Sequence, residues 1–104
     1  MSDDDSDMVA CRTPTEGRDG VTRIPAWKYD LLKRAILHAV SSAGPEGLPF
    51  SALPGALRQR ISDRDLARIG SLGWHATTVK LNMEVEGELR RTGGKGPQRL
   101  VLGE

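Results

Sequence analysis

The sequence predicts a small α+β domain, and three observations lead to this fold class. Apolar residues recur at helical spacing over much of residues 25–86, and the pattern becomes strand-like after Gly87. A segment rich in glycine, residues 93–97, separates two short strand-like runs, which is typical of an antiparallel hairpin. A chain of 104 residues has room for one domain with one modest core.

The first helix is expected to begin at Pro25 and to end near Ser42. Proline suits the first helical turn, where its missing N–H donor costs nothing. The apolar stripe of this helix consists of Tyr29, Leu32, Ile36, Ala39 and Val40. Residues 48–50 are short and apolar.

A second helix is expected after Ser51, which has the side chain of an N-cap. Its buried line is Leu53, Leu57 and Ile61, which are spaced by four. Residues 62–69 form a turn or a short helix that ends at Gly70. Ser71 then stands where it could cap the next helix.

The last helix runs from about Trp74 or His75 to Glu86, and Gly87 ends it in a left-handed conformation. Two buried faces are consistent with its sequence, and the sequence leaves the choice open. The first face consists of Trp74, Thr78, Leu81 and Val85; the second consists of Val79 and Met83. Trp74 could stack on a base, but a tryptophan at the start of a helix more often packs in the core, and we expect Trp74 to do so.

This order of helix, strand, helix, short helix or turn, helix, strand, strand resembles the winged helix-turn-helix superfamily. The chain is similar to a family of small bacterial winged-helix proteins of unknown function. The residues that carry the likeness are Arg23-Ile24-Pro25, Gly73-Trp74, Thr78-Val79-Lys80-Leu81, Met83-Glu84, Gly87 and Arg91. The resemblance covers about residues 21–103 and implies a three-helix core with a small antiparallel sheet and a C-terminal β-hairpin wing. It also implies that residues 48–50 form a short strand that pairs with this hairpin. It implies no single function, because winged helices also serve as protein-interaction modules.

Charge divides the chain unevenly. Residues 1–20 hold six acids and two bases, a net charge of −4, whereas residues 21–104 hold thirteen bases and eight acids, a net charge of +5. Residues 1–20 also lack an apolar period, so we expect a disordered acidic tail followed by a winged-helix domain over 21–104. The tail either only aids solubility or folds back on the basic face and competes with an anionic ligand.

The localisation expected from the sequence is cytoplasmic. Cys11 is the only cysteine, so no intramolecular disulfide can form, which fits a reducing compartment. No apolar run approaches the length of a membrane span, and the acidic N-terminus does not have the pattern of a signal peptide.

Two groups of residues are candidates for contacting nucleic acid. The predicted wing carries four bases within ten residues, namely Arg90, Arg91, Lys95 and Arg99. Bases beside a glycine-rich turn can contact phosphates, although charge on a hairpin edge also protects it from aggregation. The last helix offers His75, Thr77, Thr78 and Lys80 in the half that would enter a major groove.

Acids at the end of the last helix oppose that interpretation. Residues 75–88 include Lys80 but also Glu84, Glu86 and Glu88, a net charge of −2, which is unfavourable against phosphates. An ordinary packing helix with an acidic end is the alternative. Arg90 and Arg91 are neighbours in a strand and should point to opposite faces, so at most one of them lies on the side of the nucleic acid.

The leading hypothesis is therefore a small protein that binds double-stranded DNA, either a transcriptional regulator or an accessory nucleoid-type protein. The alternative is a protein-interaction module, including a homodimer, that uses the last helix. Burial of Val79 and Met83 would leave a polar outward face and favour DNA, whereas their exposure would favour a protein partner. The sequence predicts no enzyme, cofactor, metal site, membrane contact or small-molecule ligand, because no zinc spacing, phosphate loop or nucleophile with its base is present.

Overall fold

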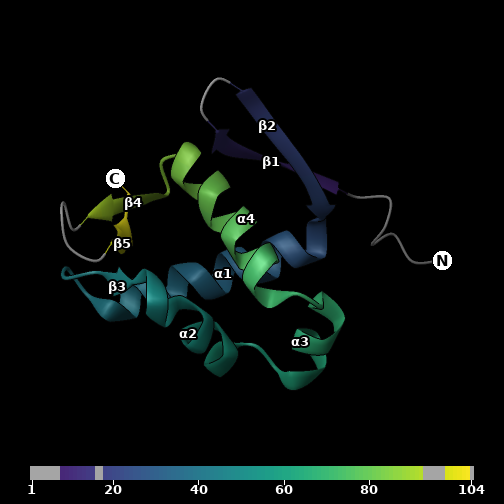
Figure 1. The fold of residues 1–104 in the computed structure, drawn as a ribbon. Helices are drawn as coiled ribbons and strands as arrows, with labels where there is room; N and C mark the ends of the chain where they lie inside the picture. Colours follow the sequence, from purple (N-terminus) through teal and green to yellow (C-terminus); the bar gives the residue numbers. More distant parts are fainter. Residues whose placement is uncertain (1–7, 16–17, 93–97, 104) are drawn as a thin grey trace.

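The computed structural model describes residues 8–15, 18–92 and 98–103, which form a mixed α+β domain with four α-helices and two small antiparallel sheets (Figure 1). The predicted α+β class is confirmed. The elements in chain order are β1 (Met8–Thr15), β2 (Arg18–Pro25), α1 (Ala26–Ala43), β3 (Leu48–Pro49), the 3₁₀ turn η1 (Phe50–Ala52), α2 (Leu53–Arg60), α3 (Asp63–Ile69), α4 (Leu72–Val85), β4 (Leu89–Thr92) and β5 (Arg99–Leu102).

Helices α1, α2 and α4 enclose the core. Leu32 and Ile36 of α1 and Leu57 of α2 are fully buried in it, as are Val79 and Met83 of α4. The apolar lines predicted for the first two helices are confirmed, because every residue of both lines is buried. Figure 1 shows α4 crossing in front of α1, with α2 and α3 below it.

The second sheet has the strand order β3-β5-β4 and closes one end of the core. Leu100 of β5 pairs with Leu48 of β3 on one side and with Arg91 of β4 on the other. The predicted pairing of residues 48–50 with the hairpin is therefore confirmed for β3. Gly87 has a φ of 82°, the left-handed conformation expected at the end of α4, and it lets the chain turn from α4 into β4.

The start of the second helix differs from the prediction. The 3₁₀ turn η1 occupies residues 50–52, α2 begins only at Leu53, and Ser51 makes no capping bond. The backbone N–H of Phe50 donates to the carbonyl of Gln98 at 3.1 Å, so this segment is held to the β5 side of the sheet before the helix can begin. Ser71 is the N-cap residue of α4 but likewise makes no side-chain capping bond.

The expectation that residues 1–20 form a disordered tail is wrong for the part of them that the structure describes. Strands β1 and β2 form an antiparallel hairpin in which Cys11 pairs with Thr22. Cys11 and Ile24 are buried and belong to the core. The backbone N–H of Arg12 donates to Oδ1 of Asn82 at 2.9 Å. These contacts with the rest of the core, and not a local apolar period, hold the hairpin; residues 1–7 and 16–17 lie outside the described residues.

Asn82 links this hairpin to the first helix. Its Nδ2 donates to the hydroxyl of Tyr29 on α1 at 2.8 Å, while its Oδ1 accepts from Arg12 on β1. A buried asparagine with partners for both its oxygen and its nitrogen fixes the positions of those partners. One side chain on α4 therefore sets the distance between β1 and α1.

Stability is expected to fall at alkaline pH because three groups at this interface hold their protons more tightly when the chain is folded. Burial raises the pKa of the Cys11 thiol and of the Tyr29 hydroxyl, and the hydrogen bond to Glu88 raises the pKa of the Lys33 ammonium. A group with a raised folded pKa stabilises fully below its unfolded pKa and loses that contribution as the pH rises. We predict that the free energy of unfolding, measured by urea denaturation, declines from about pH 9.0 upward.

The control for this prediction is Cys11→Ala, which removes the thiol with the lowest unfolded pKa of the three groups. In this variant the decline should begin nearer the unfolded pKa of tyrosine, 10.0. A free energy of unfolding that stays constant between about pH 8 and pH 11 would show that folding does not raise the pKa values of these three groups.

Candidate interaction surface on helix α4

Helix α4 buries two of its sides and opens the third. Val79 and Met83 face the core, and Thr78 and Asn82 are buried toward the β1–β2 hairpin. The outward side carries Trp74, Leu81 and Val85. These residues share one stripe because Leu81 and Val85 lie seven and eleven residues after Trp74, which is close to two and three helical turns. Trp74 is 51% exposed, Val85 is 40% exposed and Leu81 is half-buried. We call these three residues the outer stripe.

The outer stripe corrects two expectations. Trp74 does not anchor the core: its exposed ring meets the His75 ring edge-on, with ring centroids 4.8 Å apart. The expected consequence of burying Val79 and Met83, a polar outward face, is also wrong. The two faces that the sequence left open are divided, because Val79 and Met83 are fully buried while Trp74 and Val85 stay exposed. Val79 and Met83 are four residues apart and occupy the core side of α4. The large side chains at other positions of the helix, Trp74 and Val85, therefore point outward.

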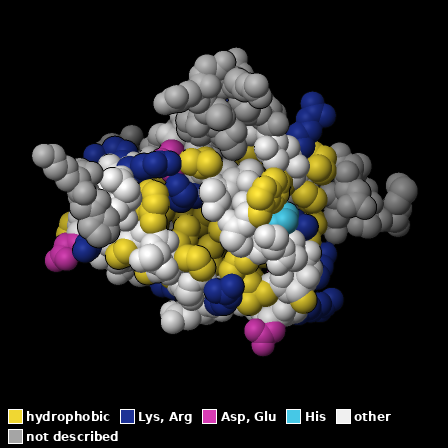
Figure 2. Space-filling view, in the orientation of Figure 1, with side chains coloured by type: hydrophobic (Ala, Val, Ile, Leu, Met, Phe, Trp, Pro, Cys, Tyr) yellow, Lys and Arg dark blue, Asp and Glu magenta, His cyan; other side chains and the backbone are white. Residues whose placement is uncertain are grey.

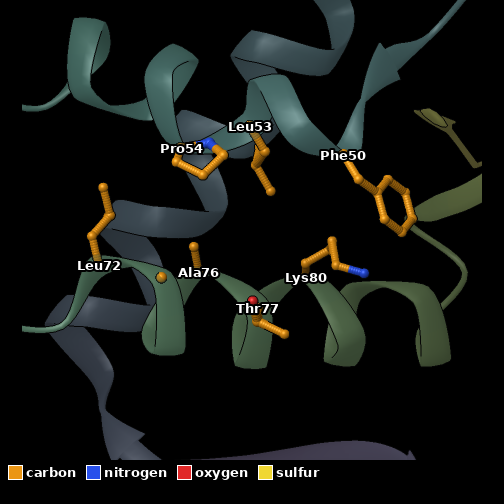
Figure 3. A pocket seen from close by; sticks show the side chains of 8 residues that line it. Phe50, Leu53, Pro54, Leu72, Ala76, Thr77 and Lys80 are labelled. Carbon is orange, nitrogen blue, oxygen red and sulfur yellow. The ribbon is translucent and has the colours of Figure 1, made fainter. Parts of the chain in front are cut away.

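An apolar groove lies between α2 and α4. Its volume is about 230 Å³. Figure 3 shows Leu53 and Pro54 on one wall and Ala76 and Thr77 on the other, with Leu72 at one end. At the opposite end are the Lys80 ammonium and the Phe50 ring (Figure 3). The groove is therefore apolar along its length and charged at one end.

The surface around this groove is apolar at its centre and carries more basic than acidic side chains at its margin (Figure 2). Figure 2 shows hydrophobic side chains gathered in a hollow between α4 and α2, with Lys and Arg side chains around its margin. Acidic side chains are few on this view and lie toward its edges. A partner that fits this face would therefore be apolar at its centre and either neutral or acidic around it.

A cluster of charged side chains forms the end of the groove. Nζ of Lys80 lies 2.7 Å from Oε2 of Glu84, and Nε of Arg91 donates to Oε1 of the same carboxylate. The Lys80 and Glu84 side chains are only 8% and 13% exposed, whereas the Arg91 side chain is 44% exposed. Nζ of Lys80 and Cζ of Arg91 also lie 4.4 Å and 5.3 Å from the centroid of the Phe50 ring. We call Lys80, Glu84 and Arg91 the end cluster.

The candidate residues of the last helix divide into two pairs. Thr77 is exposed and His75 is half-buried, so both are accessible on the N-terminal half of α4. Thr78 is buried, and its Oγ1 donates to the Trp74 carbonyl at 2.9 Å. Lys80 is buried and held by Glu84. Thr78 and Lys80 therefore have intramolecular partners where the hypothesis needed them to face a nucleic acid.

The candidate residues of the hairpin are also separated. Arg91 belongs to the end cluster, whereas Arg90 is exposed on the opposite face of β4, beside a cavity lined by the C-terminal part of α1. The prediction that these two arginines point to opposite faces is confirmed. Arg99 is half-buried on β5. Lys95 lies outside the described residues.

Sequence reasoning missed Glu84 as a partner and Phe50 and Gly73 as parts of a groove. One signal was present: Lys80 and Glu84 are four residues apart, the spacing at which opposite charges pair on a helix. The charge of Glu84 alone predicts only that it opposes phosphate binding, and that prediction does not pair it with Lys80. The contribution of Phe50 had no signal in the sequence, because η1 and α4 meet only in the folded chain.

Within the described ranges, no three His, Cys, Asp or Glu side chains gather closely enough to hold a metal ion. None of the helices in the described part of the chain combines the length and hydropathy needed to cross a bilayer. A family model described as a family of unknown function (DUF6958) matches residues 8–100. No curated protein and no solved structure gives a significant match.

The end cluster predicts a large difference between two neighbouring glutamates. Glu84→Ala leaves the buried Lys80 ammonium without its carboxylate, so we expect a loss of about 3 kcal/mol in the free energy of unfolding. Glu86→Ala is the matched control, because Glu86 is exposed just after α4 and its loss should cost under about 0.5 kcal/mol. Urea denaturation of both variants measures the difference, and equal losses would mean that removing Glu84 does not leave Lys80 as an uncompensated buried charge.

Proposed function

The chain belongs to the DUF6958 family of unknown function, and we propose that it is a protein-interaction module that binds a helical segment of a partner protein in the apolar groove. The main support is that α4 exposes large apolar side chains and also forms one wall of that groove. Trp74 and Val85 are exposed by 51% and 40%, and the groove is lined mainly by apolar residues. An apolar groove on a helix that also exposes large apolar side chains is typical of helix-in-groove recognition.

We also propose that the fold is a winged helix. Two facts support this assignment: α1, β3, α2, α4 and the β4–β5 hairpin follow one another in the order of that fold, and the sheet order is β3-β5-β4. The β1–β2 hairpin precedes this order as an addition. Winged helices bind either nucleic acid or protein, so the surface of α4 must decide between these functions.

The charges on α4 favour a protein. A DNA interface neutralises several phosphates in a row, so it needs several cations that no neighbouring acid offsets. Here Lys80 and Arg91 share the carboxylate of Glu84, and Lys80 is almost fully buried. The end of α4 therefore has a net charge of only +1 from these three side chains, which suits one carboxylate of a protein partner better than a row of phosphates.

The proposal predicts that groove-dependent binders can be selected from helical peptides. The probe is a displayed library of alanine-based helices of about sixteen residues, randomised along one face, and the target is the full chain. Gly73 lines the groove in the first turn of α4, and no neighbouring atom lies within 4 Å of the position that a Cβ would take there. Gly73→Leu should therefore fill the groove without strain and lower the affinity of selected peptides by about tenfold or more, measured by fluorescence anisotropy.

The matched control is Gly55→Leu. Gly55 lies on α2, has equally open space where a Cβ would stand and does not line the groove. Binding to this variant should stay within about twofold of the original chain. A library that yields no binder, or binders that Gly73→Leu leaves unaffected, would count against the protein-interaction function.

Binding of double-stranded DNA is the second candidate function, as for a small transcriptional regulator. The observation that favours it is the accessibility of Trp74, His75 and Thr77 on the N-terminal half of α4, the half with which groove-reading helices contact bases. Under this candidate, the wing would supply phosphate contacts from Arg99 and Lys95.

The DNA candidate makes its own prediction. Random-sequence duplex DNA, titrated at two salt concentrations, should bind more weakly at higher salt, and Lys95→Ala combined with Arg99→Ala should weaken binding and reduce the salt slope by about 2. Fluorescence anisotropy of labelled DNA measures both effects. Absence of binding at low salt would remove DNA from the candidates and leave the protein partner.

A further inference from the structure

We propose that the helix bound in the apolar groove is acidic, and that one of its carboxylates is received by Lys80 and Arg91 at the end of the groove. This inference rests on the proposed function and adds the chemistry of the partner to it. The observations that carry it are the charge of the end cluster, its place in the groove and the length of the groove.

The end cluster has one more positive charge than negative. Glu84 is the single carboxylate shared by Lys80 and Arg91, so the cluster has a net charge of +1. A lysine ammonium has three N–H donors and an arginine guanidinium has five, and Glu84 accepts one from each. Further donors of both cations can therefore bind a second carboxylate without displacing the first.

The surroundings of the cluster strengthen its attraction for an anion. Lys80 lines the apolar groove, and the Phe50 ring lies against both cations, with 4.4 Å between Nζ and the ring centroid for Lys80. Charges beside apolar walls are screened less than charges in open water. The Arg91 side chain is 44% exposed and so keeps its guanidinium within reach of a partner. A basic partner would be repelled by the excess positive charge, because the single carboxylate of the cluster, Glu84, is already paired with both cations.

The length of the groove sets the spacing expected in the partner. From Leu72 at one end to Lys80 at the other, α4 advances eight residues, about 12 Å at the helical rise. A partner helix lying along the groove would cover the same length with apolar residues at positions i and i+4 and an Asp or Glu at i+7 or i+8. Figure 3 shows the two ends that these positions would meet.

A second copy of the chain fits this site less well than an acidic helix. Among the described residues, the exposed large apolar side chains that a copy would offer from a helix are Trp74 and Val85 of α4, and the acid within α4 is Glu84, which is already bound by the two cations. Two copies that meet through their grooves would also bring together two clusters of net positive charge. Charge complementarity therefore favours a different chain with a free carboxylate.

The test uses the helical library with position i+7 or i+8 open to all residue types. We expect the selected peptides to carry Asp or Glu there, and replacement of that acid by its amide to weaken binding by about tenfold. Arg91→Gln should lower the affinity for the acidic peptide by about tenfold and leave the affinity for its amide variant unchanged. The matched control is Arg90→Gln, the neighbouring arginine on the opposite face of β4, which should change neither affinity by more than about twofold.

The outcomes separate this inference from the proposed function. Selected peptides that depend on an open groove, as shown by Gly73→Leu, but have no acidic preference at i+7 or i+8 would overturn the inference and leave the proposed function standing. Equal effects of Arg91→Gln and Arg90→Gln would also overturn it, because a general loss of positive charge would then explain the result. Peptides that ignore the groove altogether would overturn both.

Discussion

The packing of α4 against the core and the β1–β2 hairpin determines which side of the helix stays exposed to solvent. Val79 and Met83 bind the helix to the core, and Asn82 binds it to the β1–β2 hairpin and to Tyr29 of α1. A helix packed on two sides cannot rotate to expose a different face without breaking apolar contacts and buried hydrogen bonds together. The remaining surface of the helix consists of the outer stripe and the wall of the groove. These are the parts of α4 that stay open to another molecule.

Local signals were enough to predict most of the helical part of the fold. Pro25 marks the start of α1, the four-residue spacing of Leu53, Leu57 and Ile61 gives the buried line of α2, and Gly87 ends α4 with a positive φ. Each of these depends on residues close in sequence. The β1–β2 hairpin does not: its inward residues Val9 and Cys11 form too short an alternation to stand out among acidic and polar neighbours. Its stability comes from α4 and the core, to which the sequence pattern gives no access.

The candidate site was less predictable because net charge is a poor guide to available charge. The sequence offers Lys80 for contact with a DNA groove, but the structure buries it against Glu84. The spacing of four residues could have shown this pair. The bond from Arg91 to Glu84 is harder to foresee, because it crosses the turn at Gly87 and requires β4 to fold back beside α4. Counting charges along one helix therefore missed the cation that the next strand supplies.

The end cluster is more easily understood through recognition than through stability. A buried ion pair contributes little net stability compared with apolar residues of the same volume, because removing both charges from water costs nearly as much as their attraction returns. Apolar side chains at Lys80 and Glu84 would extend the groove and hold α4 at least as well. What such residues would lack is a charge fixed in position at the groove end, with one exposed arginine beside it. A fixed charge restricts which helices bind and in which direction they lie. An apolar groove alone would accept any amphipathic helix in either direction, so we interpret the cluster as the part of the surface that selects the partner.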